Sequence, residues 1–137
     1  MDPTKVKGFL KYHSYIIFPL LLIVLCLIIN KYSTVLELNN NKAEALISVS
    51  SSLLGVLITI LTIYLAVPRS EIIIKRLRES KHEHIYLSNI AVGIILLFIS
   101  IIGWIFLDNV LILTITFLSS ISNIAIAVYY TFKIITS

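Results

Sequence analysis

Residues 85–132, IYLSNIAVGIILLFISIIGWIFLDNVLILTITFLSSISNIAIAVYYTF, decide the fold of this chain. They hold two apolar runs, about 85–107 and 110–132, and only Asp108 and Asn109 separate them. Each run is long enough to cross a bilayer, which takes roughly 20 residues of helix at about 1.5 Å per residue. The short polar break therefore predicts two antiparallel transmembrane helices joined by a tight turn.

Two more apolar runs precede this hairpin, at about 12–29 and 45–67, and no run carries a charged residue or a histidine in its interior. The four runs occupy most of the 137 residues, so no separate soluble domain fits. The fold class that follows is an all-α membrane protein, a four-transmembrane-helix bundle that forms one domain over residues 1–137.

The composition agrees with a membrane protein. Hydrophobic residues make up 58% of the chain and charged residues 13%, and the mean hydropathy is +1.01. A soluble protein of this size exposes too much surface to carry so few charges. The apolar side chains are therefore expected to face lipid. Cys26, the single cysteine, lies within an apolar run and is expected to be a packing residue.

Lysine and arginine are unevenly distributed between the two ends of the predicted helices. Three lie in the N-terminal tail, five in the loop 68–84 and one after the fourth run, nine in all, against two at the other ends. Cytoplasmic segments are the ones enriched in these residues. Both termini and the loop 68–84 are thus predicted to be cytoplasmic. The nine are Lys5, Lys7, Lys11, Arg69, Lys75, Arg76, Arg78, Lys81 and Lys133, and the two are Lys31 and Lys42.

Small and hydroxyl residues recur every three or four positions along three of the helices, which places them on one face of each. Lipid provides no hydrophobic force between helices, so such faces support close helix packing. The pattern predicts either packing within the bundle or contact between copies in a homo-oligomer, and a face that lines a water-filled pore is the alternative. The residues are Ala45, Ser48, Ser52, Gly55, Thr59, Thr62 and Ala66, then Asn89, Gly93, Ser100 and Gly103, and then Thr116, Ser120, Asn123 and Ala127.

Two residues inside the helices invite a functional interpretation as well as a structural one. Asn123 lies near the middle of the fourth run, where a buried amide needs a hydrogen-bond partner. We expect a serine or threonine hydroxyl on another helix, and a pore-lining role is the alternative. Pro19 removes a backbone hydrogen bond from the first helix and predicts a kink. A gating hinge would look the same in sequence.

The basic loop is the predicted contact surface. Arg69, Lys75, Arg76, Arg78 and Lys81 would either lie on anionic lipid headgroups or bind a cytoplasmic protein partner. The neighbouring run 82–84, His-Glu-His, does not predict a metal site, because adjacent helical positions point apart.

Several classes of protein are excluded by what the chain lacks. A proton-coupled exporter needs a carboxylate within the membrane, and every Asp and Glu lies outside the four runs. The small multidrug exporters are therefore a poor match, and the Gly-rich, Arg-containing helix start of the small fluoride channels is not found. The sequence also holds no nucleophile–base pair, phosphate loop or metal cluster. We expect no enzyme activity, no cofactor and no direct contact with nucleic acid.

Residues 50–61, SSSLLGVLITIL, followed by Val67 and Pro68, resemble small membrane proteins of bacterial anti-phage defence systems. The four-helix plan resembles the membrane subunit of the Kiwa system. The resemblance implies an oligomeric sensor of infection in the bacterial cytoplasmic (inner) membrane that recruits a cytoplasmic subunit, and it assigns no residue a role. The other hypothesis is a pore former, holin-like or an abortive-infection effector, that depolarises the membrane.

Overall fold

The computed structural model describes residues 3–36, 38–66 and 82–136, and all of its regular elements within that part of the chain are helices. A short helix α1 (Pro3–Tyr12) is followed by four long ones, α2 (Ser14–Tyr32), α3 (Asn40–Ala66), α5 (His82–Leu107) and α6 (Val110–Thr136). The four long helices are sufficiently long and apolar to cross a membrane. The prediction of an all-α protein with four candidate spans is confirmed, and the chain is a multi-pass membrane protein.

The helix boundaries differ from the predicted ones in two places. No helix was predicted before residue 12, but Pro3–Tyr12 form a separate helix, α1. The second span begins at Asn40 rather than near residue 45. The side chain of Asn39 explains this early start, because its Oδ1 accepts a hydrogen bond from the backbone N–H of Lys42 at 3.0 Å and caps the helix. The connection between α2 and α3 is correspondingly shorter than the gap between the two predicted runs.

The turn between α5 and α6 is as tight as predicted. Asp108 takes a left-handed conformation with φ 48°, which short polar side chains tolerate better than most. Its N–H donates to the carbonyl of Trp104 at 3.0 Å and closes α5. Asn109 then caps α6, because its Oδ1 accepts hydrogen bonds from the backbone N–H groups of Leu111 and Ile112 at 3.0 and 3.1 Å.

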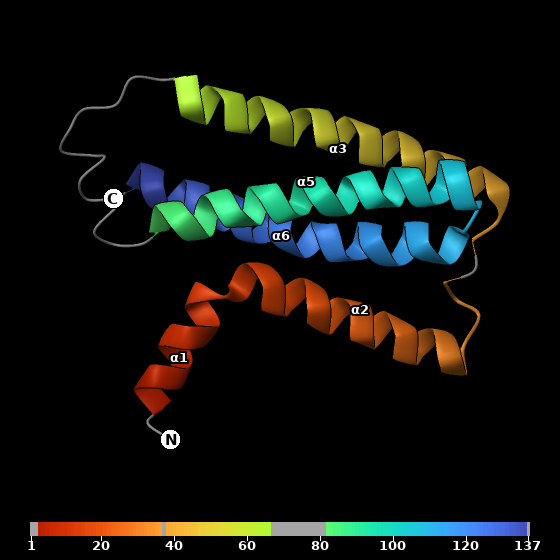
Figure 1. The fold of residues 1–137 in the computed structure, drawn as a ribbon, viewed down its shortest axis with the longest axis horizontal. Helices are drawn as coiled ribbons and strands as arrows, with labels where there is room; N and C mark the ends of the chain where they lie inside the picture. Colours follow the sequence, from red (N-terminus) through yellow and green to blue (C-terminus); the bar gives the residue numbers. More distant parts are fainter. Residues whose placement is uncertain (1–2, 37, 67–81, 137) are drawn as a thin grey trace.

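The α5–α6 hairpin forms the centre of the molecule, and the other two spans flank it. α2 packs chiefly on α6, and α3 packs chiefly on α5. Figure 1 shows α2 and α3 on opposite sides of the hairpin. The largest fully buried apolar side chains, Ile90, Leu97 and Leu113, all belong to the hairpin. α2 and α3 consequently turn most of their surface outward, as expected of helices that face lipid or other proteins.

Candidate functional site

The small-residue face of α3 points away from the bundle. We call it the α3 outer face, and all seven of its members are exposed: Ala45, Ser48, Ser52, Gly55, Thr59, Thr62 and Ala66. The opposite side of α3, which buries Ala43, Ser50 and Leu57, packs on the hairpin. Packing of the outer face inside the chain, one of the two predicted uses, is therefore wrong for this helix. Leucines fill the space between α3 and the hairpin instead.

The hydroxyl groups of the α3 outer face form hydrogen bonds within their own helix. Ser52 donates to the carbonyl of Ser48 at 3.0 Å, Thr59 to that of Gly55 at 2.8 Å and Thr62 to that of Ile58 at 2.8 Å. No donor among these three needs water, so the face can lie in lipid or against another helix. A Cβ added at Gly55 would meet no atom of the described chain within 4 Å. The surface there is open to a neighbouring backbone.

The corresponding residues of α5 and α6 are placed differently, because they line the contact inside the hairpin. Thr116 is half-buried and the other members are buried: Asn89, Gly93, Ser100, Gly103, Ser120, Asn123 and Ala127. Ser100 donates a hydrogen bond across the contact to the carbonyl of Leu113 at 3.1 Å. The two helices approach closely at Gly103, where an added Cβ would lie 2.7 Å from the Cγ2 of Ile112.

Asn123 joins α6 to α2 at the site of the proline. Its Nδ2 donates to the backbone carbonyl of Tyr15 at 3.4 Å. In a regular helix that carbonyl would accept from the N–H of residue 19, four positions on, but Pro19 has no N–H. The predicted partner, a serine or threonine hydroxyl, is therefore wrong. The amide of Asn123 takes the place of the missing backbone donor, so the proline and the asparagine form one structural unit.

Buried oxygens without a hydrogen-bond partner lie near this unit. Within the described part of the chain they include Ser14 Oγ, Asn89 Oδ1 and Asn123 Oδ1. Asn89 uses its Nδ2 on the carbonyl of Ile85 at 2.7 Å. Gly93, one helical turn further along α5, would place a Cβ 3.6 Å from that of Asn123. This polar core is uncharged, so it can accept hydrogen bonds but is unsuited to proton-coupled exchange.

Aromatic and charged side chains connect four helices at the end of the bundle where α5 begins. The ring of Tyr12 stacks on His84 with 5.1 Å between centroids, and Tyr15 meets the same imidazole edge-on at 6.1 Å. The hydroxyl of Tyr64, near the end of α3, donates to Glu83 Oε1 at 2.9 Å. These contacts hold the ends of α1, α2, α3 and α5 together. They were not foreseen, because His84 was assigned to the loop rather than to the first turn of a helix.

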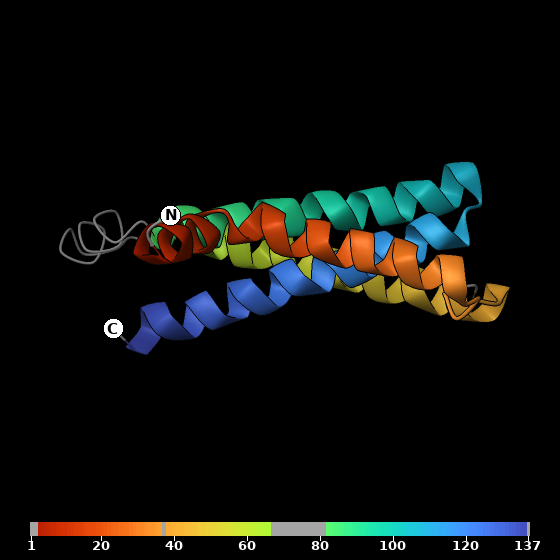
Figure 2. The same ribbon diagram turned by 90° about the horizontal axis from the view of Figure 1, so that it is seen from below.

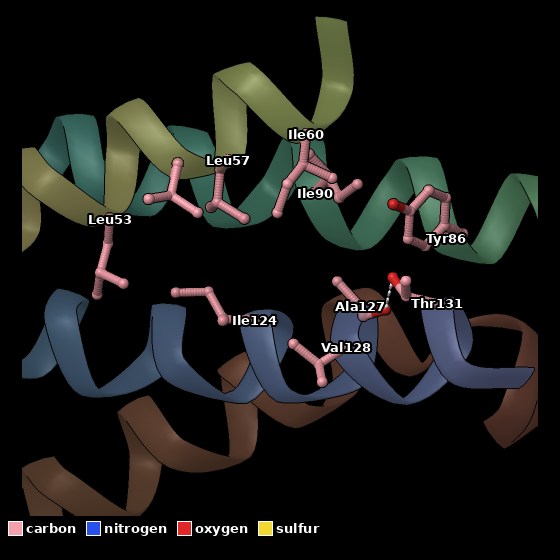
Figure 3. Close-up of a pocket in the computed structure, with 10 residues that line it drawn as sticks. Leu53, Leu57, Ile60, Tyr86, Ile90, Ile124, Ala127, Val128 and Thr131 are labelled. Carbon is pink, nitrogen blue, oxygen red and sulfur yellow. Dashed lines mark hydrogen bonds between the residues drawn. The ribbon is translucent and has the colours of Figure 1, made fainter. Parts of the chain in front are cut away.

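An apolar cavity of about 100 Å³ lies between α3, α5 and α6. Figure 3 shows its walls, which are aliphatic except for the hydroxyls of Tyr86 and Thr131 at one end. The hydroxyl of Thr131 donates to the carbonyl of Ala127 at 2.9 Å and is not free for a ligand. The cavity suits hydrocarbon better than a polar substrate, because its lining is almost entirely apolar.

The remaining predicted contact residues, Arg69, Lys75, Arg76, Arg78 and Lys81, lie outside the described residues. Elsewhere in the described chain, no three His, Cys, Asp or Glu side chains come together in a way that could hold a metal ion. Cys26 is buried as a free thiol and packs with Leu36 and Ile115. Comparison of the chain with protein-family models, with curated proteins and with solved structures finds no match.

Proposed function

We propose that this protein is a non-enzymatic membrane scaffold that assembles with copies of itself through the α3 outer face. The observation that supports the proposal is the exposure of all seven small residues of that face, opposite a leucine-rich face that packs inside the chain. Small side chains permit close backbone approach, which is the main source of helix association in lipid. Within the described part of a single chain, the α3 outer face makes no helix contact that would require small side chains, whereas a contact with a second copy would.

The spacing of the face fits a symmetric parallel contact. A repeat of 3.5 residues is typical of left-handed crossings of about 20°. Two copies with the same orientation in a membrane are related by a two-fold axis along its normal, so each α3 would meet its own counterpart. Ser52, Gly55 and Thr59 would lie near that axis. Larger cyclic assemblies would use the same face.

Disulfide cross-linking tests this contact. In a Cys26→Ala background, Thr59→Cys would place a thiol on the α3 outer face, and Ile58→Cys would place one at the same depth about a quarter-turn away. Both positions are exposed in the single chain. We expect oxidation in native membranes to give covalent dimers with Thr59→Cys and few with Ile58→Cys. Equal cross-linking of both variants would contradict the proposal.

The same proposal includes the sidedness inferred from the lysines and arginines, with both termini and the loop 68–84 in the cytoplasm of a bacterium. Thr34→Cys, between α2 and α3, should then react with an impermeant maleimide on intact cells from which the outer membrane barrier has been removed. Ser80→Cys should react only after lysis. The reverse pattern would reject this orientation without affecting the α3 contact.

The basic residues are proposed to recruit a cytoplasmic protein. The resemblance to defence-system membrane subunits adds the expectation that the stimulus is infection. Reversing the charges of Arg76 and Arg78 to Glu should abolish co-purification with that partner, because like charges are then brought together. Co-purification at the wild-type level would remove the loop from the proposal.

A pore is the second candidate, and the hydroxyls on the α3 outer face favour it. If three or more copies surrounded an axis, Ser48, Ser52 and Thr59 could face water instead of protein. Flux of ions from liposomes that contain the pure protein discriminates between the two functions. Robust leakage would favour the pore, and intact vesicles that contain the cross-linkable oligomer would favour the scaffold.

A further inference from the structure

The short helix α1 does not continue the line of α2. His13 interrupts the helix with φ −100° and ψ 16°, and its Nδ1 lies 3.2 Å from the carbonyl of Phe9. Figure 1 shows α1 turning away from the bundle axis, and Figure 2, the same ribbon seen from below, shows it nearly end-on. The two views agree that α1 runs across the direction of the spans, at the end of the bundle where α5 begins.

One face of α1 is apolar, and the described part of the chain leaves much of it uncovered. Val6, Phe9 and Leu10 share this face through i, i+3 and i+4 spacing. The side chains of Phe9 and Leu10 are 60% and 47% exposed. Exposed aromatic and aliphatic side chains beside a transmembrane span are at the right height to enter the boundary between headgroups and acyl chains.

Lysines supply all the side-chain charge of α1, since no carboxylate occurs between residues 3 and 12. Lys7 and Lys11 lie outside the apolar face, and both are exposed. Lysines in these positions can extend from a partly immersed helix to anionic headgroups. An acidic phospholipid surface therefore complements both the charge and the apolar face of α1.

The orientation of α1 is fixed by contacts at its end nearest the bundle. Tyr12 stacks on His84 of α5, and the ring of His13 lies against those of Phe9 and Tyr12 at 4.4 and 5.0 Å between centroids. These contacts hold α1 across the direction of the spans, and therefore along the membrane surface, before it binds lipid. Little orientational freedom is lost when it settles on the bilayer, which strengthens a contact of otherwise modest size.

We infer that α1 is an interfacial anchor that binds anionic phospholipid headgroups of the bilayer in which the four spans are embedded. The inference is independent of the oligomer and of any partner protein. It also differs from the role proposed for the loop 68–84, which is to bind a cytoplasmic protein. The anchor would set the depth of α2 and the position of the Tyr12–His84 contact.

A tryptophan introduced at position 9 tests this inference in the full-length protein. Trp104 is the only native tryptophan, so Phe9→Trp in a Trp104→Phe background reports on α1 alone. The variant would be reconstituted in phosphatidylcholine vesicles with and without phosphatidylglycerol. With the anionic lipid, we expect the introduced tryptophan to be quenched by lipids brominated near the headgroup end of the acyl chain and to be shielded from acrylamide.

Charge reversal provides the second arm. Lys7→Glu with Lys11→Glu should lower the ratio of docked to free α1 by at least about tenfold in anionic vesicles, because two attractions to the lipid surface become repulsions. The matched control reverses the same charge at the other end of the spans, Lys31→Glu with Lys42→Glu, and should leave the tryptophan of α1 docked. Unchanged helix content by circular dichroism would show that each variant is folded.

Two results would overturn the inference. One is an introduced tryptophan that is equally open to acrylamide in both vesicle types, which would mean that α1 lies in water. The other is a tryptophan that is equally shielded without anionic lipid and unaffected by charge reversal, which would mean that neither the anionic headgroups nor the lysines hold α1 in place.

Discussion

Asn123 and Pro19 lie far apart in sequence but act on the same backbone carbonyl, that of Tyr15. The carbonyl of Tyr15 has lost its usual donor because residue 19 is proline, and the amide of Asn123 supplies one at 3.4 Å. An unpaired carbonyl in hydrocarbon is costly. The asparagine in the middle of α6 is therefore explained without invoking a pore, and the proline-containing turn of α2 is tied to the hairpin.

A double-mutant cycle tests this pairing. Asn123→Leu should lower the free energy of unfolding in detergent by about 1 kcal/mol, the range of membrane hydrogen bonds. In a Pro19→Leu background the cost should be smaller, because the N–H of residue 19 can then donate to the Tyr15 carbonyl. Asn89→Leu is the control, since Asn89 donates within its own helix. Additive effects of Asn123→Leu and Pro19→Leu would contradict the pairing.

The glycines provide the second prediction at this scale. Gly103→Ala should destabilise the hairpin by about 1–3 kcal/mol, because the new Cβ would lie 2.7 Å from the stiff β-branched side chain of Ile112. Gly55→Ala should not lower the stability of the single chain, because nothing lies within 4 Å. Thermal unfolding of both variants in monomerising detergent measures the difference. Equal destabilisation would contradict the close α5–α6 contact.

At the scale of single residues, the sequence predicted which positions matter better than what they contact. Asn123 and Pro19 were both identified from the sequence, but a hydroxyl was expected as the partner of Asn123. The sequence does contain a signal for the true partner, because a proline in a helix leaves the carbonyl four residues earlier without a donor. What sequence could not supply was the packing of α2 against α6, which brings that carbonyl to the amide.

Among the elements, the α5–α6 hairpin is the one most completely encoded locally. Its turn needs one left-handed residue and one cap, and Asp108 and Asn109 supply them in order. Asn109→Ala should lower the free energy of unfolding by about 1 kcal/mol, the usual worth of an N-cap. Asn39→Ala, at the start of α3, should give a loss of the same order, because the Oδ1 of Asn39 also accepts from a backbone N–H of the first turn. No loss in either variant, measured by denaturant titration in detergent, would mean that lipid-facing helices do not depend on these caps.

The other elements could be predicted only in part. The four spans follow from hydropathy and are present, whereas α1 is too short for a span and was missed. α3 posed a different problem, since it carries two faces of nearly the same period, one rich in leucine and one in small residues. Periodicity shows that α3 has both a leucine-rich face and a small-residue face. The shape of the hairpin surface decides which of the two faces packs against it.

Viewed as a whole, the molecule is a central hairpin flanked by α2 and α3 (Figure 1), and both flanking helices have much free surface. One free surface, the α3 outer face, is suited by its small side chains to another helix, and one free element, α1, is suited to an anionic bilayer surface. The orientation of the helices in the membrane is proposed from the distribution of lysine and arginine. The partner protein is proposed from the basic loop 68–84, most of which lies outside the described residues.

Native mass spectrometry from a mild detergent tests the proposed assembly most directly. The chain has a mass of 15.5 kDa. For the wild type we predict peaks of an oligomer, at twice that mass or a higher whole-number multiple. Gly55→Leu should shift them to the monomer without loss of helix content. A large side chain on the α3 outer face blocks close approach, while its Cβ has no atom of the described chain within 4 Å. A wild type that is monomeric under conditions that preserve membrane oligomers would contradict the account.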